Sequence, residues 1–215
     1  MSFSGAFIKP FRPAFDAGAK SLVRYTLTLQ PNEPDAIDCV IRYTLPTVNE
    51  QSWYVGGGGP PYDYAALAKF DLSSIPVGAS IVSATLSLWP WLGGGLTTNF
   101  TISRILSANS SWTENGATWN TTNGAAAWAG AAGCRTSGID YSSTPLFGPA
   151  NSSGGPGEVQ FALNATEFAL MVSSNYGFIH FNDTTSPTGS GYRFYRASGY
   201  ATASERPKLV VVYDA

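Results

Sequence analysis

Apolar and polar residues alternate with a period of two along much of this 215-residue chain, and short Gly- and Pro-rich stretches separate the alternating segments. In the clearest case, Val82, Ala84, Leu86 and Leu88 are separated by Ser or Thr. Successive side chains of a strand point to opposite faces, so this pattern is typical of an antiparallel strand with one buried face. Its repetition between turn signals predicts an all-β fold, an antiparallel, jelly-roll-like β-sandwich.

One segment fits a short helix instead of a strand. Asn164 can cap a helix, and Glu167 follows three residues later, which is close to a capping box. We expect a helix of about two turns that ends near Asn175. The predicted strands are 25–30, 37–44, 52–55, 65–71, 80–91, 99–106, 159–163, 176–182, 192–197 and 208–213.

The chain divides into a predicted N-terminal arm, residues 1–24, and a β-sandwich domain, residues 25–215. The arm is aromatic, has no clean period and is interrupted by Pro10 and Pro13. Aromatic residues commonly anchor interfaces, so the arm could dock on a neighbouring subunit. It could equally pack along the edge of its own sandwich. The candidate anchors are Phe3, Phe7, Phe11 and Phe15.

Charge is sparse, and this excludes several functions. Only 12% of residues are charged, the formal net charge is −2, and no cluster of Lys or Arg occurs. Phosphate neutralisation needs such a cluster, so no nucleic-acid binding is expected. No run of 18 apolar residues occurs, so no membrane insertion is expected. No signal peptide is recognisable at the start of the sequence, which leaves another export route, release by lysis or a trimmed signal.

Titratable residues do not form a catalytic pattern. The single histidine, His180, lies in an alternating apolar segment and is interpreted as structural, so no enzyme activity is expected. Asp140 and Asp183 are weak candidates for a calcium site, and no other cofactor is expected. Cys39 and Cys134 are interpreted as buried free thiols in preference to a disulfide.

Aromatic residues near predicted loops are candidates for glycan binding, because sugars stack on exposed rings. Each ring could instead belong to the core. Two of them, Trp89 and Trp91, are two residues apart and are expected to share one face of a strand. The candidates are Trp53, Tyr54, Tyr62, Tyr64, Trp89, Trp91, Tyr192 and Tyr195.

The long stretch 107–157 is rich in small and polar residues but contains Trp112, Trp119 and Trp128. A structureless segment of this length is uncommon in a compact domain. Burial of three large rings would hold it in place, so we expect these tryptophans to attach it to the sandwich.

Three stretches together, 66–88, 112–128 and 205–213, resemble the DNRLRE domain family, which is also grouped with carbohydrate-binding module family 96 and the disaggregatase-related modules. The resemblance covers about residues 27–213. It implies a jelly-roll-like sandwich that binds and does not catalyse, with polysaccharide as a ligand of some members. The chain departs from the family at Gly133-Cys134-Arg135, where relatives often carry a Gly-Gly-Asp-like turn.

These observations give two functional hypotheses. The first is a non-catalytic, surface-displayed structural module, above all a phage or virus capsid decoration or fibre-associated protein, with glycans as a further ligand. Its partners would be other structural proteins of the assembly, or further copies of itself, on the virion surface or outside the cell. The alternative is a carbohydrate-binding module of a secreted bacterial polysaccharide-active or cell-surface protein.

Overall fold

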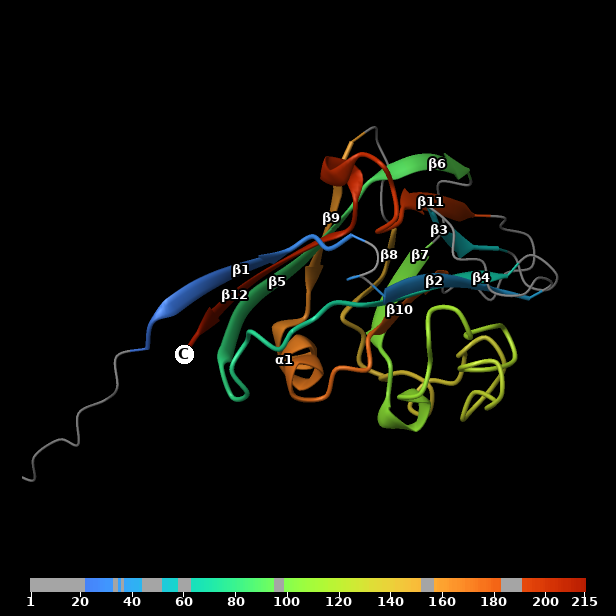
Figure 1. The fold of residues 1–215 in the computed structure, drawn as a ribbon, viewed down its shortest axis with the longest axis horizontal. Coiled ribbons are helices and arrows are strands. Elements are labelled where there is room, and N and C mark those ends of the chain that lie inside the picture. Colours follow the sequence, from blue (N-terminus) through green and yellow to red (C-terminus); the bar gives the residue numbers. More distant parts are fainter. Residues whose placement is uncertain are drawn as a thin grey trace, which may run out of the picture.

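The computed structural model describes residues 22–32, 35, 37–43, 52–57, 63–94, 99–151, 157–182 and 191–215. In these residues two antiparallel sheets pack face to face, and one short α-helix covers an end of the interface between them (Figure 1). The predicted all-β sandwich with one short helix is confirmed. The predicted arm lies mostly outside the described residues, and the division into arm and domain stays a prediction.

The smaller sheet has four strands in the order β1-β12-β5-β9. Their bounds are Arg24–Leu29 for β1, Lys208–Asp214 for β12, Ser80–Leu88 for β5 and Val159–Leu163 for β9. Buried and partly exposed residues alternate along β12, as a strand with one face toward a core requires. The last strand lies beside the first, so the C-terminus ends next to the start of β1 (Figure 1).

The larger sheet has eight strands in the order β6-β11-β3-β4-β10-β7-β8, and β2 pairs with β4. It curls into a half-barrel, so that β6, β11 and β3 rise above β4 and β2 (Figure 1). The bounds are Ile37–Arg42 (β2), Ser52–Gly56 (β3), Tyr64–Lys69 (β4), Pro90–Gly94 (β6), Asn99–Arg104 (β7), Phe147–Asn151 (β8), Phe178–Asn182 (β10) and Tyr192–Arg196 (β11).

The main core fills the space between the two sheets. Leu86 and Phe161 from the smaller sheet meet Phe178 and Tyr195 from the larger one, and each of these side chains is at most 1% exposed. Full burial of side chains of this size stabilises the fold by about 1.5–3 kcal/mol each. The alternation identifies the core face of β12 and of β5 from Ala84 onward, whereas Val82 is 42% exposed and β10 is buried along its whole length.

The helix α1, Ala165–Ser173, begins and ends close to its predicted bounds. The Asn164 side chain accepts hydrogen bonds from the backbone amides of Thr166 and Glu167, at 3.0 and 3.3 Å. Phe168 and Met171 are buried in the main core. Two short 3₁₀ helices, Ser107–Asn109 and Ala203–Glu205, complete the described helices. None of the helices in the described residues has the length and apolar character needed to cross a membrane.

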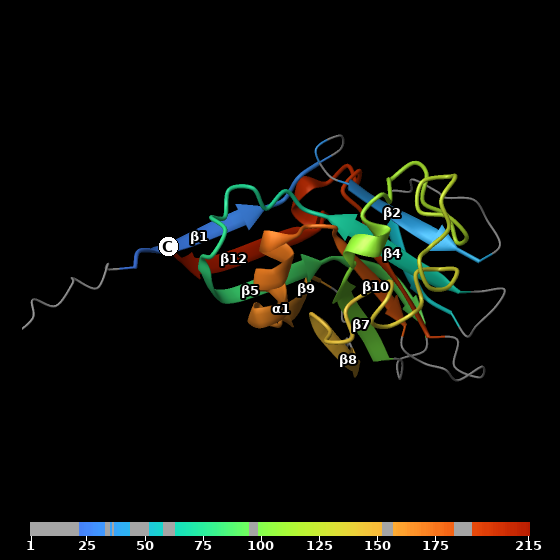
Figure 2. The same ribbon diagram turned by 90° about the horizontal axis from the view of Figure 1, so that it is seen from below.

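The long segment 105–146 folds over the outer face of β2, β4 and β10 and forms a second core there (Figure 2). Trp112 and Trp128 are only 7% and 5% exposed. The Trp112 Nε1 donates to the carbonyl of Tyr176 at 2.6 Å, and the Trp128 Nε1 donates to the carbonyl of Thr118 at 3.0 Å. The expectation that tryptophans attach this segment to the sandwich is confirmed.

The strand prediction is wrong at two places. The segment 80–91 was expected to be one strand, but β5 ends at Leu88 and β6 begins at Pro90, because the chain passes there from the smaller sheet to the larger one. The strand β8 was not expected, since Gly148-Pro149 is typical of a turn. It pairs with β7 at the border of the sheet, where a proline is tolerated.

His180 gives the fold a testable pH dependence. It is fully buried among the rings of Phe100, Phe161 and Tyr195, and neither of its ring nitrogens has a hydrogen-bond partner in the described structure. Burial lowers its pKa to about 3. The unfolded chain, with an ordinary pKa near 6.5, binds more protons below that pH, so stability falls as the pH falls.

We predict that the free energy of unfolding drops by about 1.4 kcal/mol between pH 7.5 and 5.5 because of this group. The substitution His180→Phe should remove this slope and stabilise the fold at pH 5.5, because it removes buried unpaired nitrogens. Urea unfolding of both proteins at the two pH values measures the effect. An equal slope in the two proteins would contradict the assignment.

Candidate functional site

A row of partly exposed aromatic side chains crosses β6, β11 and β3 on the face that the main core does not use. Along β11, Tyr195 points into the core, so Tyr192 and Phe194 point away from it. The Phe194 ring is at the centre, with the ring centroid of Tyr192 at 5.1 Å, that of Tyr54 at 4.5 Å and that of Trp91 at 5.6 Å. Three neighbouring strands thus contribute rings to one cluster.

Two guanidinium groups extend the cluster in opposite directions. The Arg42 Cζ lies 4.4 Å from the centroid of the Tyr54 ring and 5.7 Å from that of Tyr64. At the other end, the Arg196 Cζ lies 5.1 Å from the centroid of Trp91 and 4.0 Å from that of Tyr200. Such contacts fix the planes of the groups that they join. We call this set the aromatic stripe: Arg42, Tyr54, Tyr64, Trp91, Tyr192, Phe194, Arg196 and Tyr200.

The aromatic stripe is accessible to a ligand. Trp91 is 42% exposed and Tyr192 is 36% exposed, while the other members are half-buried. Rings offer an apolar face with a polar edge, and guanidinium groups add up to five fixed hydrogen-bond donors each. The Arg196 charge is partly balanced by Glu205, whose Oε2 is 3.3 Å from the Arg196 Nε. This combination suits a ligand with apolar C–H faces and many hydroxyl groups.

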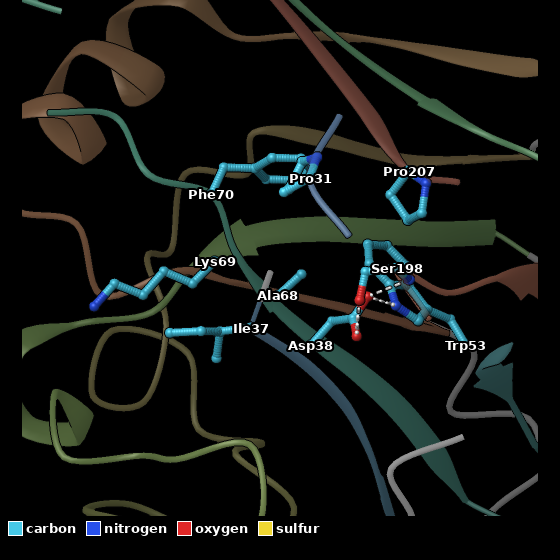
Figure 3. Close-up of a pocket in the computed structure, with 9 residues that line it drawn as sticks. All are labelled: Pro31, Ile37, Asp38, Trp53, Ala68, Lys69, Phe70, Ser198 and Pro207. Carbon is cyan, nitrogen blue, oxygen red and sulfur yellow. Dashed lines mark hydrogen bonds between the residues drawn. The ribbon is translucent and has the colours of Figure 1, made fainter. Parts of the chain in front are cut away.

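A buried carboxylate holds the strands of the aromatic stripe together. Asp38 on β2 is 4% exposed, and Figure 3 shows its carboxylate between Trp53 and Ser198. It accepts hydrogen bonds from the Trp53 Nε1 at 2.8 Å and from the backbone amide and hydroxyl of Ser198, both at 2.9 Å. The backbone amide of Asp38 donates to Glu114 at 3.3 Å. Glu114 therefore connects β2 to the long segment.

The space beside Asp38 is too small for a ligand. The cavity between Asp38, Phe70 and Pro207 has a volume of about 10 Å³ (Figure 3). That volume is at the lower limit for a single water molecule. Asp38 therefore has a structural role.

Two of the predicted glycan-binding residues belong to the core instead. Trp53 is 1% exposed and Tyr195 is 0% exposed, and both pack in the main core. Trp53 was predicted together with Tyr54, and Tyr195 together with Tyr192. The two residues of each pair lie on opposite faces of one strand, so only one of them can be accessible. Trp89 is half-buried in the break between β5 and β6, and its carbonyl accepts from the backbone amide of Arg196 at 3.0 Å.

The structure brings together four predicted residues, Tyr54, Tyr64, Trp91 and Tyr192, in the aromatic stripe. The sequence prediction missed the other four. Phe194 and Arg196 follow Tyr192 at intervals of two, so strand periodicity could have identified them. No local signal identifies Arg42 or Tyr200, because they reach the stripe through strand pairing and a turn. Predicted residues outside the described residues are Phe3, Phe7, Phe11, Phe15, Tyr62 and Asp183.

Asp140 has a structural role in the long segment. Its carboxylate is fully buried and accepts hydrogen bonds from the Asn109 side chain and the amides of Gly130, Ala131 and Thr136, at 2.8–3.1 Å. Burial raises its pKa, but these four donors outweigh burial, and the pKa lies below its usual value. The donors occupy the lone pairs that calcium would need. No group of three or more metal-ligating side chains occurs in the described residues.

Other reactive side chains are buried and inactive as nucleophiles. The structure describes Cys39 and Cys134 as free and buried thiols, and burial raises the pKa of each well above its usual value. A thiol in this state is not a nucleophile at neutral pH. The buried, neutral His180 is inaccessible as a catalytic base. Neither cysteine can therefore pair with His180 as a nucleophile and base.

Comparison with known families finds a match over part of the chain. Residues 47–139 match carbohydrate-binding module family 96. The matched segment holds β3 to β7 and most of the long segment, and it contains Tyr54, Tyr64 and Trp91 of the aromatic stripe. The predicted resemblance to family 96 is confirmed over these residues, which are fewer than half of the chain. A carbohydrate-binding module is a non-catalytic domain. No curated protein matches the chain.

The different positions of two tryptophans predict different mutational effects. Trp53→Ala should destabilise the fold by about 3–5 kcal/mol, because it empties a core site and removes one of the hydrogen-bond donors to the buried Asp38 carboxylate. Trp91→Ala should cost less than about 1 kcal/mol, because this ring is accessible. Urea unfolding of the two variants measures the difference. Equal losses would contradict the assignment of one ring to the core and the other to the surface.

Proposed function

We propose that this protein is a non-catalytic polysaccharide-binding module that binds its ligand on the aromatic stripe. The observation that carries the proposal is the continuity of the stripe, in which each ring or guanidinium lies within 5.7 Å of the next. The match to family 96 supports it, because part of the stripe belongs to the matched segment.

The physical basis of binding is stacking combined with hydrogen bonding. The C–H face of a pyranose ring is apolar and packs on an aromatic face, while its hydroxyl groups need donors and acceptors. Trp91 and Tyr192 supply accessible rings, and Arg42 and Arg196 supply donors. Ring planes that are already fixed by their neighbours lose little conformational entropy on binding.

Consecutive rings favour a polymeric ligand over a single sugar. Rings contributed by separate strands give several stacking positions along one surface, and a chain of sugars can occupy more than one of them at once. Linked contacts raise the overall affinity without any new type of interaction. That the protein acts outside the cell or on a virion surface is a further part of the proposal.

The hypothesis of a virion decoration protein with an assembly arm has no support in the described residues or the family comparison. The arm residues on which it depends lie outside the described residues. It stays a prediction, while the carbohydrate-binding hypothesis has both a surface and a family match.

We predict that Trp91→Ala and Tyr192→Ala each weaken polysaccharide binding about tenfold, because each removes about 1.4 kcal/mol of stacking. A polysaccharide array identifies the ligand, and titration of each variant against that ligand measures the dissociation constant. Tyr25→Ala is the matched control, since Tyr25 is an exposed tyrosine, 45% accessible, on β1 of the other sheet.

The control variant should bind within about twofold of the unmodified protein. Absence of binding to every polysaccharide on the array would refute the proposed function. Equal affinities of the Tyr192 and Tyr25 variants would instead place binding away from the aromatic stripe.

A further inference from the structure

A second recess lies on the larger sheet, apart from the aromatic stripe. It has a volume of about 240 Å³, and β7, β8, β10 and the end of the long segment enclose it. Since one water molecule occupies roughly 30 Å³ of liquid, this is space for about eight waters. No residue of the aromatic stripe lines it.

The floor of the recess holds two hydroxyl groups without partners. Phe100 and Ile102 of β7 point into the main core, so Thr101 and Ser103 point to the other face, where they line the recess. These two side chains are only 6% and 1% exposed, and neither hydroxyl has a hydrogen-bond partner in the described structure. A buried unsatisfied polar group is costly, so its presence in a recess points to a ligand or an ordered solvent molecule.

The walls of the recess combine hydroxyl groups with aromatic rings. The Tyr141 and Phe181 rings are 5.1 Å apart and both line it. Ser142 is fixed, because its hydroxyl donates to Glu167 at 2.9 Å and the Glu167 carboxylate also accepts from the Arg104 Nε at 2.7 Å. Ser137 and Ser143 are exposed at the rim.

The lining is neutral. None of the nine described residues that line the recess is charged. An anionic ligand would have no ion pair there, whereas a neutral polyol could both donate to and accept from the serine and threonine hydroxyls. Water alone would satisfy the hydroxyls but would gain nothing from the two rings, which suit the C–H face of a sugar.

We propose that this recess is a second carbohydrate subsite, which binds one neutral pyranose residue. The choice of a sugar over another neutral polyol rests on the proposed function. The recess and its unpaired hydroxyls are observed independently of that function. The Thr101 and Ser103 hydroxyls would bond to the hydroxyls of the sugar, and Tyr141 and Phe181 would contact its apolar face.

The test is a protein-observed NMR titration with five neutral sugars: the methyl glycosides of D-glucose, D-galactose, D-mannose, D-xylose and N-acetyl-D-glucosamine. We expect at least one of them to cause saturable shifts at the amides of residues 101–103 and 137–145. The double variant Thr101→Val/Ser103→Ala should weaken that binding at least about tenfold, because it removes both hydroxyls and keeps the shape of the floor. Trp91→Ala should leave it unchanged.

A second variant, Ser143→Phe, fills the mouth of the recess from an exposed position and should also abolish the shifts. It keeps the test valid if the double variant fails to fold. Absence of saturable shifts with all five sugars would overturn the proposal, as would unchanged shifts in either variant when it is folded. The Thr101 and Ser103 hydroxyls would then be hydrogen-bonded to water.

The same variants separate the two proposals. Loss of polysaccharide binding in Trp91→Ala, with no response in the recess, would support the aromatic stripe and refute the subsite. Sugar-dependent shifts in the recess, with unchanged polysaccharide binding in Trp91→Ala and Tyr192→Ala, would support the subsite and refute the stripe.

Discussion

The buried carboxylate of Asp38 is the interaction on which the arrangement of the larger sheet depends. A carboxylate inside a protein is strongly unfavourable unless hydrogen bonds compensate its lost hydration. Asp38 meets this requirement with donors from Trp53 on β3 and Ser198 just after β11. Its own strand, β2, carries Arg42 at its end. The three chain segments that meet at Asp38 belong to, or directly follow, three strands of the aromatic stripe, so these hydrogen bonds hold the stripe strands together.

The two faces of the larger sheet have different roles. One face packs on the smaller sheet through the main core. On the other face, the long segment covers β2, β4 and β10 with Trp112 and Trp128, while β6, β11 and β3 keep accessible rings. Asp140 organises the covering segment through four hydrogen-bond donors. An aromatic side chain on this face is thus buried or accessible according to whether the long segment reaches it.

This division explains what the sequence could predict. The alternation around Leu86 and the cap at Asn164 are local, so the sandwich and its helix could be predicted closely. Tyr192 and Tyr195 were both proposed as ligand contacts, although an interval of three places them on opposite faces of a strand, and Tyr195 is core. Stricter use of the period of two would have selected Phe194. Arg42 could not be found in this way, because its contact with Tyr54 depends on how the sheet curls.

The most direct test of the central claim is a crystal structure of the protein bound to an oligosaccharide. That oligosaccharide is a fragment of the polysaccharide identified on the array. The account predicts sugar rings within about 4 Å of the Trp91 and Tyr192 rings, with the stripe strands unmoved because Asp38 already holds them. An oligosaccharide bound elsewhere, with the aromatic stripe unoccupied, would contradict it.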